Sequence, residues 1–164
     1  MPFGDAQFDV VFARAVLHHT TDLPGACREF LRVLKPGGTL LAVREHVVSR
    51  PEDLAVFLEM HPLHKLYGGE SAFLLVQYTD AICDAGFQLD TVLSPLQSAI
   101  NFAPYTLASL QAELARRVDA RLPGTEALAC RLLGVPGVWP IARVLLDRVD
   151  NRPGRLYSFI ARRP

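Results

Sequence analysis

The sequence predicts an α/β fold, a single domain built on a wound parallel sheet, and three features indicate it. Residues 8–12 (FDVVF) form a short apolar run, residues 26–34 carry apolar side chains at helical spacing, and residues 39–43 (TLLAV) form a second apolar run. Short runs of this kind are typical of parallel strands that are buried on both faces. Because two parallel strands need a helical crossover, this order favours a wound α/β sheet. The 164 residues, half of them hydrophobic, suffice for one sizeable core.

The helix between the two runs has recognisable ends. Thr21 or Asp22 can cap its first turn, in which Pro24 is tolerated. At the other end, residues 36–38 (PGG) are expected to stop the helix, because proline and glycine continue a helix poorly. Its apolar side is formed by Ala26, Phe30, Leu31, Val33 and Leu34. This stripe predicts a helix that packs against the sheet.

A helix, a loop and a second helix are expected next. Residues 61–70 are polar and rich in glycine, which predicts a loop. Thr79 is expected to cap a short helix that Gly86 stops. The helix before the loop begins at Pro51, and its buried side is expected to carry Leu54, Ala55, Phe57 and Leu58.

Two further strands complete the predicted sheet. Residues 87–93 alternate between apolar and polar side chains, as a half-buried strand does, and residues 155–161 follow a turn-forming segment. Between them, Ser94 to Gly154 form an insert that is far longer than a hairpin loop. Helices are expected to begin there at Thr106, Thr125 and Pro140. The insert is either a substrate lid or a helical subdomain or dimer contact.

The composition argues against several classes of function. Seventeen basic residues balance seventeen acidic ones, which gives no electrostatic case for binding nucleic acid or an anionic membrane. The three cysteines are widely spaced and odd in number, which fits free thiols in a reducing compartment, and we expect the cytoplasm. The longest apolar region, residues 128–146, is interrupted by arginine, proline and glycine, so no membrane span is expected.

Residues 2–43 resemble a class I S-adenosylmethionine-dependent methyltransferase. FDVVFARAVLHH is similar to the family's fourth strand and the loop after it, and RVLKPGG is similar to the end of the helix before its fifth strand. Residues 85–87 (AGF) continue the likeness, which beyond Ser94 is one of architecture alone. The resemblance implies a partial Rossmann-like methyltransferase sheet, strands four to seven, with a helical insert before the last strand. It also implies S-adenosylmethionine as the cofactor.

Three family features that hold the cofactor are not found in these residues. They are a glycine-rich loop after a first strand, an acidic residue that ends a second strand, and an acidic residue before the proline–phenylalanine pair. Gly37 and Gly38 do not replace the loop, because they follow a helix and precede a strand. The chain therefore resembles the second half of a methyltransferase, a single truncated domain over residues 1–164. We expect it to bind the cofactor poorly or not at all by itself.

The candidate site lies after the first strand, because ligands of open α/β sheets bind beyond the carboxyl ends of the strands. The resemblance places Ala13, Arg14 and Ala15 under the methionine end of the cofactor. His18 and His19 follow, and either could take a proton from an acceptor. The alternatives are that one histidine only packs the loop, and that Arg14 is a surface or ion-paired residue.

Further candidates for substrate contact follow the second strand and the loop beyond it. Glu45 and His46 end the second strand at the same sheet edge, and His64 and Tyr67 lie in the loop over residues 61–70. This loop is a substrate-side segment or an ordinary exposed connection. His61 and His64, flanked by Glu59 and Glu70, raise the question of a metal site. None is expected, because the sequence has no paired-histidine helix motif and no cysteine pair.

The resemblance implies transfer of a methyl group to a small-molecule acceptor, which the apolar insert suggests is organic or lipid-like. The alternative is a non-catalytic protein of the same fold, either a remnant or a subunit. Such a subunit would pair its open sheet edge with a second copy or with a missing amino-terminal half.

Overall fold

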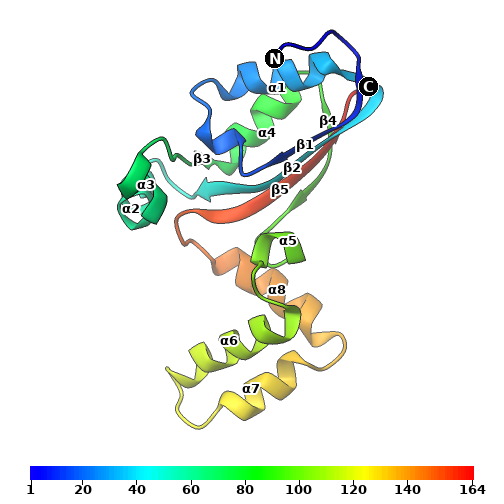
Figure 1. Ribbon diagram of the computed structural model, residues 1–164. Helices are drawn as coiled ribbons and strands as arrows, with labels where there is room; N and C mark the ends of the chain where they lie inside the picture. The colour runs from blue at the N-terminus through cyan, green and yellow to red at the C-terminus, as the bar shows by residue number, and fades with distance from the viewer. The chain divides into compact units, whose positions relative to one another are not determined.

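The computed structural model describes residues 1–164, apart from the side chain of residue 63. The chain divides into two compact units, one formed by residues 1–93 together with 151–164 and the other by residues 94–150 (Figure 1). The first unit holds the sheet and the second is helical. All the candidate site residues belong to the first unit.

The predicted strand–helix–strand unit is confirmed. It consists of β1 (Phe8–Arg14), α1 (Leu23–Val33) and β2 (Leu34–Val48). The two strands are parallel, with Val11 opposite Leu40. Asp22 caps α1, since its carboxylate accepts a hydrogen bond from the backbone N–H of Gly25 at 2.8 Å.

The other elements of the first unit extend this sheet. They are η1 (Leu17–His19), α2 (Asp53–Met60), α3 (Pro62–Tyr67), β3 (Phe73–Leu74), α4 (Leu75–Asp84), β4 (Gln88–Leu93) and β5 (Arg155–Arg162). The strand order is β1-β2-β5-β4, with β3 paired to the end of β2. β5 is antiparallel to both of its neighbours. The predicted mixed Rossmann-like sheet is thus confirmed, with β1, β2, β4 and β5 as strands four to seven.

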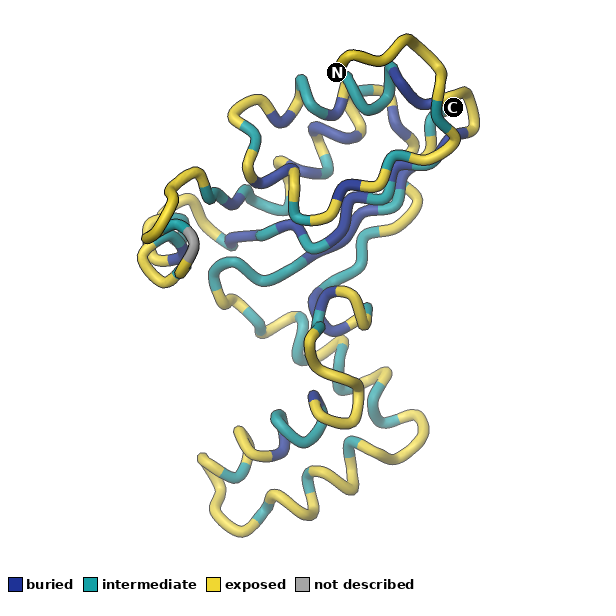
Figure 2. Tube along the Cα trace, in the orientation of Figure 1, coloured by how far each residue is buried: buried dark blue, intermediate teal, exposed yellow. Residues whose placement is uncertain are grey.

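The core of the first unit lies between the sheet and α1 and α4, which cover the same face (Figure 1). The buried positions follow the strands and the inner sides of these helices (Figure 2). The largest fully buried side chains there include Leu17, Leu34, Leu40, Tyr78, Ile82 and Phe159. A smaller cluster forms around Phe57 of α2, with Leu54 and Leu58 packed against it. Ala55 of α2 is exposed, contrary to the prediction.

The prediction that the first strand is buried on both faces is wrong. Val10 and Phe12 are 51% and 61% exposed. Side chains alternate along a strand, so these two lie on the face away from α1 and α4. Within the described residues of the first unit, no helix covers that face, and β1 pairs with β2 alone.

Two helix boundaries differ from the predictions. α1 ends at Val33, three residues before the expected stop, because Leu34 has extended backbone angles and already belongs to β2. The expected loop over residues 61–70 contains α3. Pro62 suits the first position of this helix, and Gly68, with φ of 69°, ends it.

α4 starts earlier than predicted. It begins at Leu75, and the side chain of Gln77 accepts a hydrogen bond from the backbone N–H of Leu74. Thr79 therefore lies inside the helix, where its hydroxyl donates to the carbonyl of Val76. A threonine inside a helix commonly bonds back to the preceding turn. From the sequence alone, such a threonine cannot be distinguished from one that caps a helix.

The second unit consists of helices. They are α5 (Ala99–Phe102), α6 (Leu107–Asp119), α7 (Glu126–Leu133) and α8 (Val138–Val149). Thr106 caps α6 as predicted, whereas the hydroxyl of Thr125 donates to the carbonyl of Leu122 and does not cap α7. α8 begins at Val138, with Pro140 in its first turn. Among the described residues no single helix is long and apolar enough to cross a membrane, although α7 and α8 together are, with a bend of 109° between them.

The reactivity of Cys27 toward a thiol reagent can be used to test the packing of the sheet unit. Cys27 is fully buried, and burial raises the pKa of its thiol from 9.0 to about 12. The protonated Cys27 thiol therefore contributes its full stabilisation of the fold below pH 9.0. This contribution is lost as the pH rises toward 12, where the buried thiol ionises. We expect a thiol reagent at pH 8 to modify the exposed Cys83 and Cys130 in the folded chain, and Cys27 only after unfolding. Rapid modification of all three thiols would contradict this packing.

Candidate functional site

Two unusual backbone conformations shape the carboxyl ends of β1 and β2. Ala15 and Arg44 have φ angles of 54° and 61°, in the left-handed region that residues other than glycine rarely adopt. Arg44 lies where the pairing of β2 with β5 shifts by one residue, between Ala42 and Glu45. A bulge of this kind re-aims the side chain that follows it. Here that side chain is Glu45, which is fully buried.

Glu45 holds the loop after β1 in place. One carboxylate oxygen accepts a hydrogen bond from the backbone N–H of Val16 at 3.1 Å. The other accepts from the backbone N–H of His18 at 3.1 Å and from its Nδ1 at 2.8 Å. The carboxylate is thus satisfied and inaccessible. Its role is to position His18.

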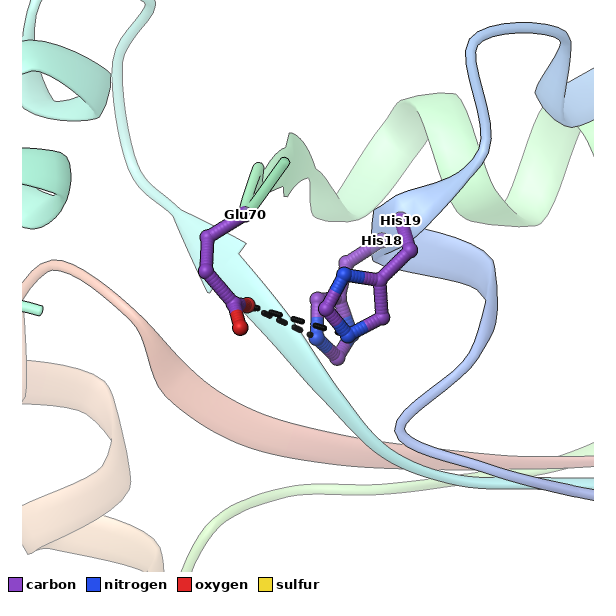
Figure 3. Close-up of side chains that lie close together, drawn as sticks. All are labelled: His18, His19 and Glu70. Carbon is purple, nitrogen blue, oxygen red and sulfur yellow. Dashed lines mark ion pairs between the residues drawn. The ribbon is translucent and has the colours of Figure 1, made fainter. Parts of the chain in front are cut away.

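The imidazole of His18 lies between two carboxylates. Its Nδ1 faces Glu45, and its Nε2 is 3.6 Å from a carboxylate oxygen of Glu70. The Nε2 of His19 is 3.7 Å from the same oxygen. Figure 3 shows the Glu70 carboxylate directed at both rings. The side chains of His18 and Glu70 are 2% and 7% exposed, whereas that of His19 is 43% exposed. We name His18, His19 and Glu70 the histidine–glutamate cluster.

His46 lies beside this cluster and is held neutral. Its ring centroid is 4.6 Å from that of His18, and its Nδ1 donates to the carbonyl of Gly154 at 2.7 Å. Burial is the main cause that lowers the pKa of His46 to about 4. The hydroxyl of Tyr78 donates to the carbonyl of His46 at 3.0 Å. These bonds fix the wall of the site.

The three residues expected near the cofactor lie at the end of β1. Ala13 is buried, and the backbone N–H of Ala15 donates to the carbonyl of Val43 at 2.8 Å. Arg14 is exposed. Burial and the charge of Arg14 lower the pKa of Arg44, so two guanidinium groups are near each other at this edge.

The structure brings together four of the predicted site residues, namely His18, His19, Glu45 and His46. His64 and Tyr67 lie on α3, and among the described side chains no hydrogen bond or ion pair joins either to the cluster. Glu70 is a site residue that the sequence reasoning did not select. It is the only acidic residue in the segment 61–70, and that was the available signal.

An apolar hollow begins one residue after Glu70. Its volume is about 260 Å³. Its walls come from the end of β2, from α2 and from the segment that leads into α4: Val48, Pro51, Leu54, Ser71, Ala72, Phe73, Leu74 and Gln77. The side chains that line it are mostly apolar.

The parallel β1–α1–β2 unit, with polar side chains gathered at its carboxyl edge, defines a Rossmann-like α/β protein with a candidate ligand site at that edge. A family model described as "Methyltransferase domain" matches residues 1–42. The match over these residues supports the predicted resemblance to the class I S-adenosylmethionine-dependent methyltransferases.

Curated relatives match about half of the chain. The ubiquinone/menaquinone biosynthesis C-methyltransferase UbiE of Vibrio parahaemolyticus is 34% identical over 84 residues, which cover 51% of this chain and 29% of that protein. The sterol 24-C-methyltransferase erg6 of Schizosaccharomyces pombe is 34% identical over 82 residues, which cover 50% of this chain and 21% of that protein. The matched part thus spans less than a third of either relative.

A solved structure shows the same fold over the whole chain. It is a candidate methyltransferase from Bacillus halodurans C-125, with a TM-score of 0.56 and 22% sequence identity. The alignment covers 100% of this chain and 68% of that one. At this identity the likeness concerns the fold.

Proposed function

We propose that this chain provides the acceptor side of an S-adenosylmethionine-dependent methyltransferase. The observation that carries the proposal is the placement of the histidine–glutamate cluster at the carboxyl ends of β1 and β2. Ligands of open α/β sheets bind at this edge. In the proposed complex, Ala13, Arg14 and Ala15 lie under the methionine end of the cofactor.

The proposed acceptor is a small organic or lipid-like molecule. Two relatives are named as C-methyltransferases of ubiquinone/menaquinone biosynthesis and of a sterol, and both names point to lipid-like acceptors. The apolar hollow that begins after Glu70 would hold part of such a molecule. Free thiols at Cys27, Cys83 and Cys130 fit action in the cytoplasm.

The chemistry asks little of the protein beyond alignment. The cofactor supplies an activated methyl group, and the acceptor must be held in line with it. His19 is the cluster member that an acceptor can reach, since its side chain is 43% exposed. Its ring can accept a proton that the acceptor loses. Glu45 and His18 fix the loop that carries His19.

A titration of the full chain with S-adenosylhomocysteine, followed by amide NMR spectra, tests the proposal and detects weak binding. We expect saturable shifts at residues 13–15 and at His18 and His19. Arg14→Ala should weaken the binding at least tenfold. The matched change Arg116→Ala, on the exposed side of α6, should leave it unchanged.

Two results would contradict the proposal. One is the absence of shifts at millimolar ligand, and the other is shifts confined to the helical unit. If sedimentation then showed a stable dimer, the non-catalytic alternative would gain support. The exposed Val10 and Phe12 on β1, a strand with one paired edge, are the observation that favours this alternative.

A further inference from the structure

Three atoms of the histidine–glutamate cluster converge on one point. One ligand atom each of His18, His19 and Glu70 lies within 4.8 Å of the others. The Nε2 atoms of both rings face the same Glu70 oxygen, at 3.6 and 3.7 Å. The atoms come from two segments about fifty residues apart in the sequence, namely η1 and the segment between α3 and β3, which carries Glu70 (Figure 3). What these three atoms can do depends on where the protons of the two rings lie.

The proton of His18 is assigned by its other nitrogen. Nδ1 lies 2.8 Å from a Glu45 oxygen that also accepts a backbone N–H, so Nδ1 is the donor in this bond. In the neutral ring Nε2 then carries a lone pair and no proton. This lone pair faces Glu70 at 3.6 Å. In this neutral form, two electron-rich atoms face each other with low exposure to water.

The proton of the His19 ring is assigned in the same way, from a different hydrogen bond. The ring's Nδ1 lies 3.2 Å from the carbonyl oxygen of Gly69, and a carbonyl can only accept, so Nδ1 is again the donor. The Nε2 of neutral His19 then presents a second lone pair to the same Glu70 oxygen, at 3.7 Å. With both rings neutral, three lone-pair donors meet at one point, and a cation between them would relieve their repulsion.

We propose that His18, His19 and Glu70 bind a divalent transition-metal ion of the zinc class. Bonds of about 2.0–2.1 Å in a tetrahedral site separate the ligand atoms by roughly 3.4 Å, close to the 3.6 and 3.7 Å found here. Imidazole and carboxylate together suit zinc and its neighbours in the first transition row.

The surroundings of the cluster are those of a supported metal site. The bond from His18 to Glu45 is the carboxylate–histidine pairing that orients a metal ligand and raises its basicity. Behind Glu70, Nδ1 of His61 lies 4.0 Å from its other carboxylate oxygen. Among the described side chains, this buried His61 nitrogen has no hydrogen-bond partner. A small shift would let it donate to Glu70 and fix the carboxylate.

This site goes beyond the proposed methyl transfer, which needs no metal. Three protein ligands leave one position of a tetrahedral ion open, as in catalytic rather than structural zinc sites. An oxygen of the acceptor would fill the open position. His19 would then act as a ligand, and the metal would lower the pKa of the bound oxygen in place of a protein base.

Calorimetric titration of the full chain with Zn²⁺ tests the proposal, and a visible d–d spectrum after loading with Co²⁺ tests the ligand type. We expect one ion per chain with micromolar or tighter affinity. His19→Gln and Glu70→Gln should each weaken binding at least tenfold. The matched changes His64→Gln and Glu59→Gln, outside the cluster, should leave the affinity within twofold.

Glu45→Gln distinguishes a residue that orients a metal ligand from the ligands themselves. It should weaken zinc binding about 10- to 100-fold, as loss of a carboxylate behind a ligating histidine does, while the cobalt spectrum keeps its form. His19→Gln is the decisive variant, because this ring is 43% exposed and its loss does not threaten folding. No binding, or binding that His19→Gln and Glu70→Gln leave unchanged, would overturn the proposal. This readout is independent of the cofactor titration, so the two proposals fail separately.

Discussion

Replacing Glu45 by alanine should lower the free energy of unfolding of the sheet unit by about 3–5 kcal/mol, because buried donors lose their acceptor and a cavity opens. The substitution leaves the backbone N–H groups of Val16 and His18 and the Nδ1 of His18 without their acceptor. It also leaves a cavity where a fully buried side chain stood.

The measurement must follow the sheet unit itself. Trp139 is the only tryptophan and lies in α8, so its fluorescence reports on the helical unit. Urea-dependent hydrogen exchange of the β1 and β2 amides measures the relevant unfolding. Glu45→Gln, which keeps the shape and one acceptor, should cost less than half as much, and Glu52→Ala, at an exposed position, should change stability by under about 0.5 kcal/mol. Equal effects of all three variants would refute the role given to Glu45.

Gly154→Ala should destabilise the sheet unit by about 3 kcal/mol through overpacking together with backbone strain. The φ angle of Gly154 is 75°, and an added Cβ would lie 2.2 and 2.3 Å from two ring carbons of Phe57. The backbone of Gly154 also donates to the carbonyl of Val47 and accepts the bond from His46. Any shift that relieved the contact would therefore disturb the wall of the site.

A matched glycine separates strain from steric contact. Gly68 has φ of 69° and nothing within 4 Å of an added Cβ, so Gly68→Ala carries backbone strain alone, about 1 kcal/mol. In the double variant Gly154→Ala with Phe57→Ala, the steric contact is absent. The double variant should therefore lose less stability than the sum of the losses in the two single variants. Thermal melts followed by far-ultraviolet circular dichroism compare the wild type with Gly154→Ala, Gly68→Ala, Phe57→Ala and the double variant. Strict additivity would show that Phe57 is not the obstacle.

The strand–helix–strand unit could be predicted because each of its signals is local. Apolar runs gave β1 and β2, and the cap at Asp22 gave the start of α1. The exposure of Val10 and Phe12 could not be predicted, because it depends on which elements cover a face of the sheet. The start of α4 was missed because its first bond comes from Gln77, whereas Thr79 offered the stronger sequence signal.

The site was predicted in part for the same reason. Parallel strands share a carboxyl edge, so His18, His19 and Glu45 could be placed near one another from topology. The burial of Glu45 depends on a bulge at Arg44, which no residue pattern announced. Glu70 joins the cluster through the fold of the segment before β3, and its role becomes visible only once the ring nitrogens are placed in space.

The bonds from Glu45 to the loop after β1 have a thermodynamic corollary. Glu45 of β2 binds both the backbone of the loop after β1 and the imidazole ring of His18 in that loop. Ordering of the loop and folding of the sheet are therefore expected to be coupled. Whatever the loop captures in the folded state will shift the folding equilibrium by mass action. Screening compounds or ions by the melting of the sheet is therefore a direct way to find the molecule for which the loop is built.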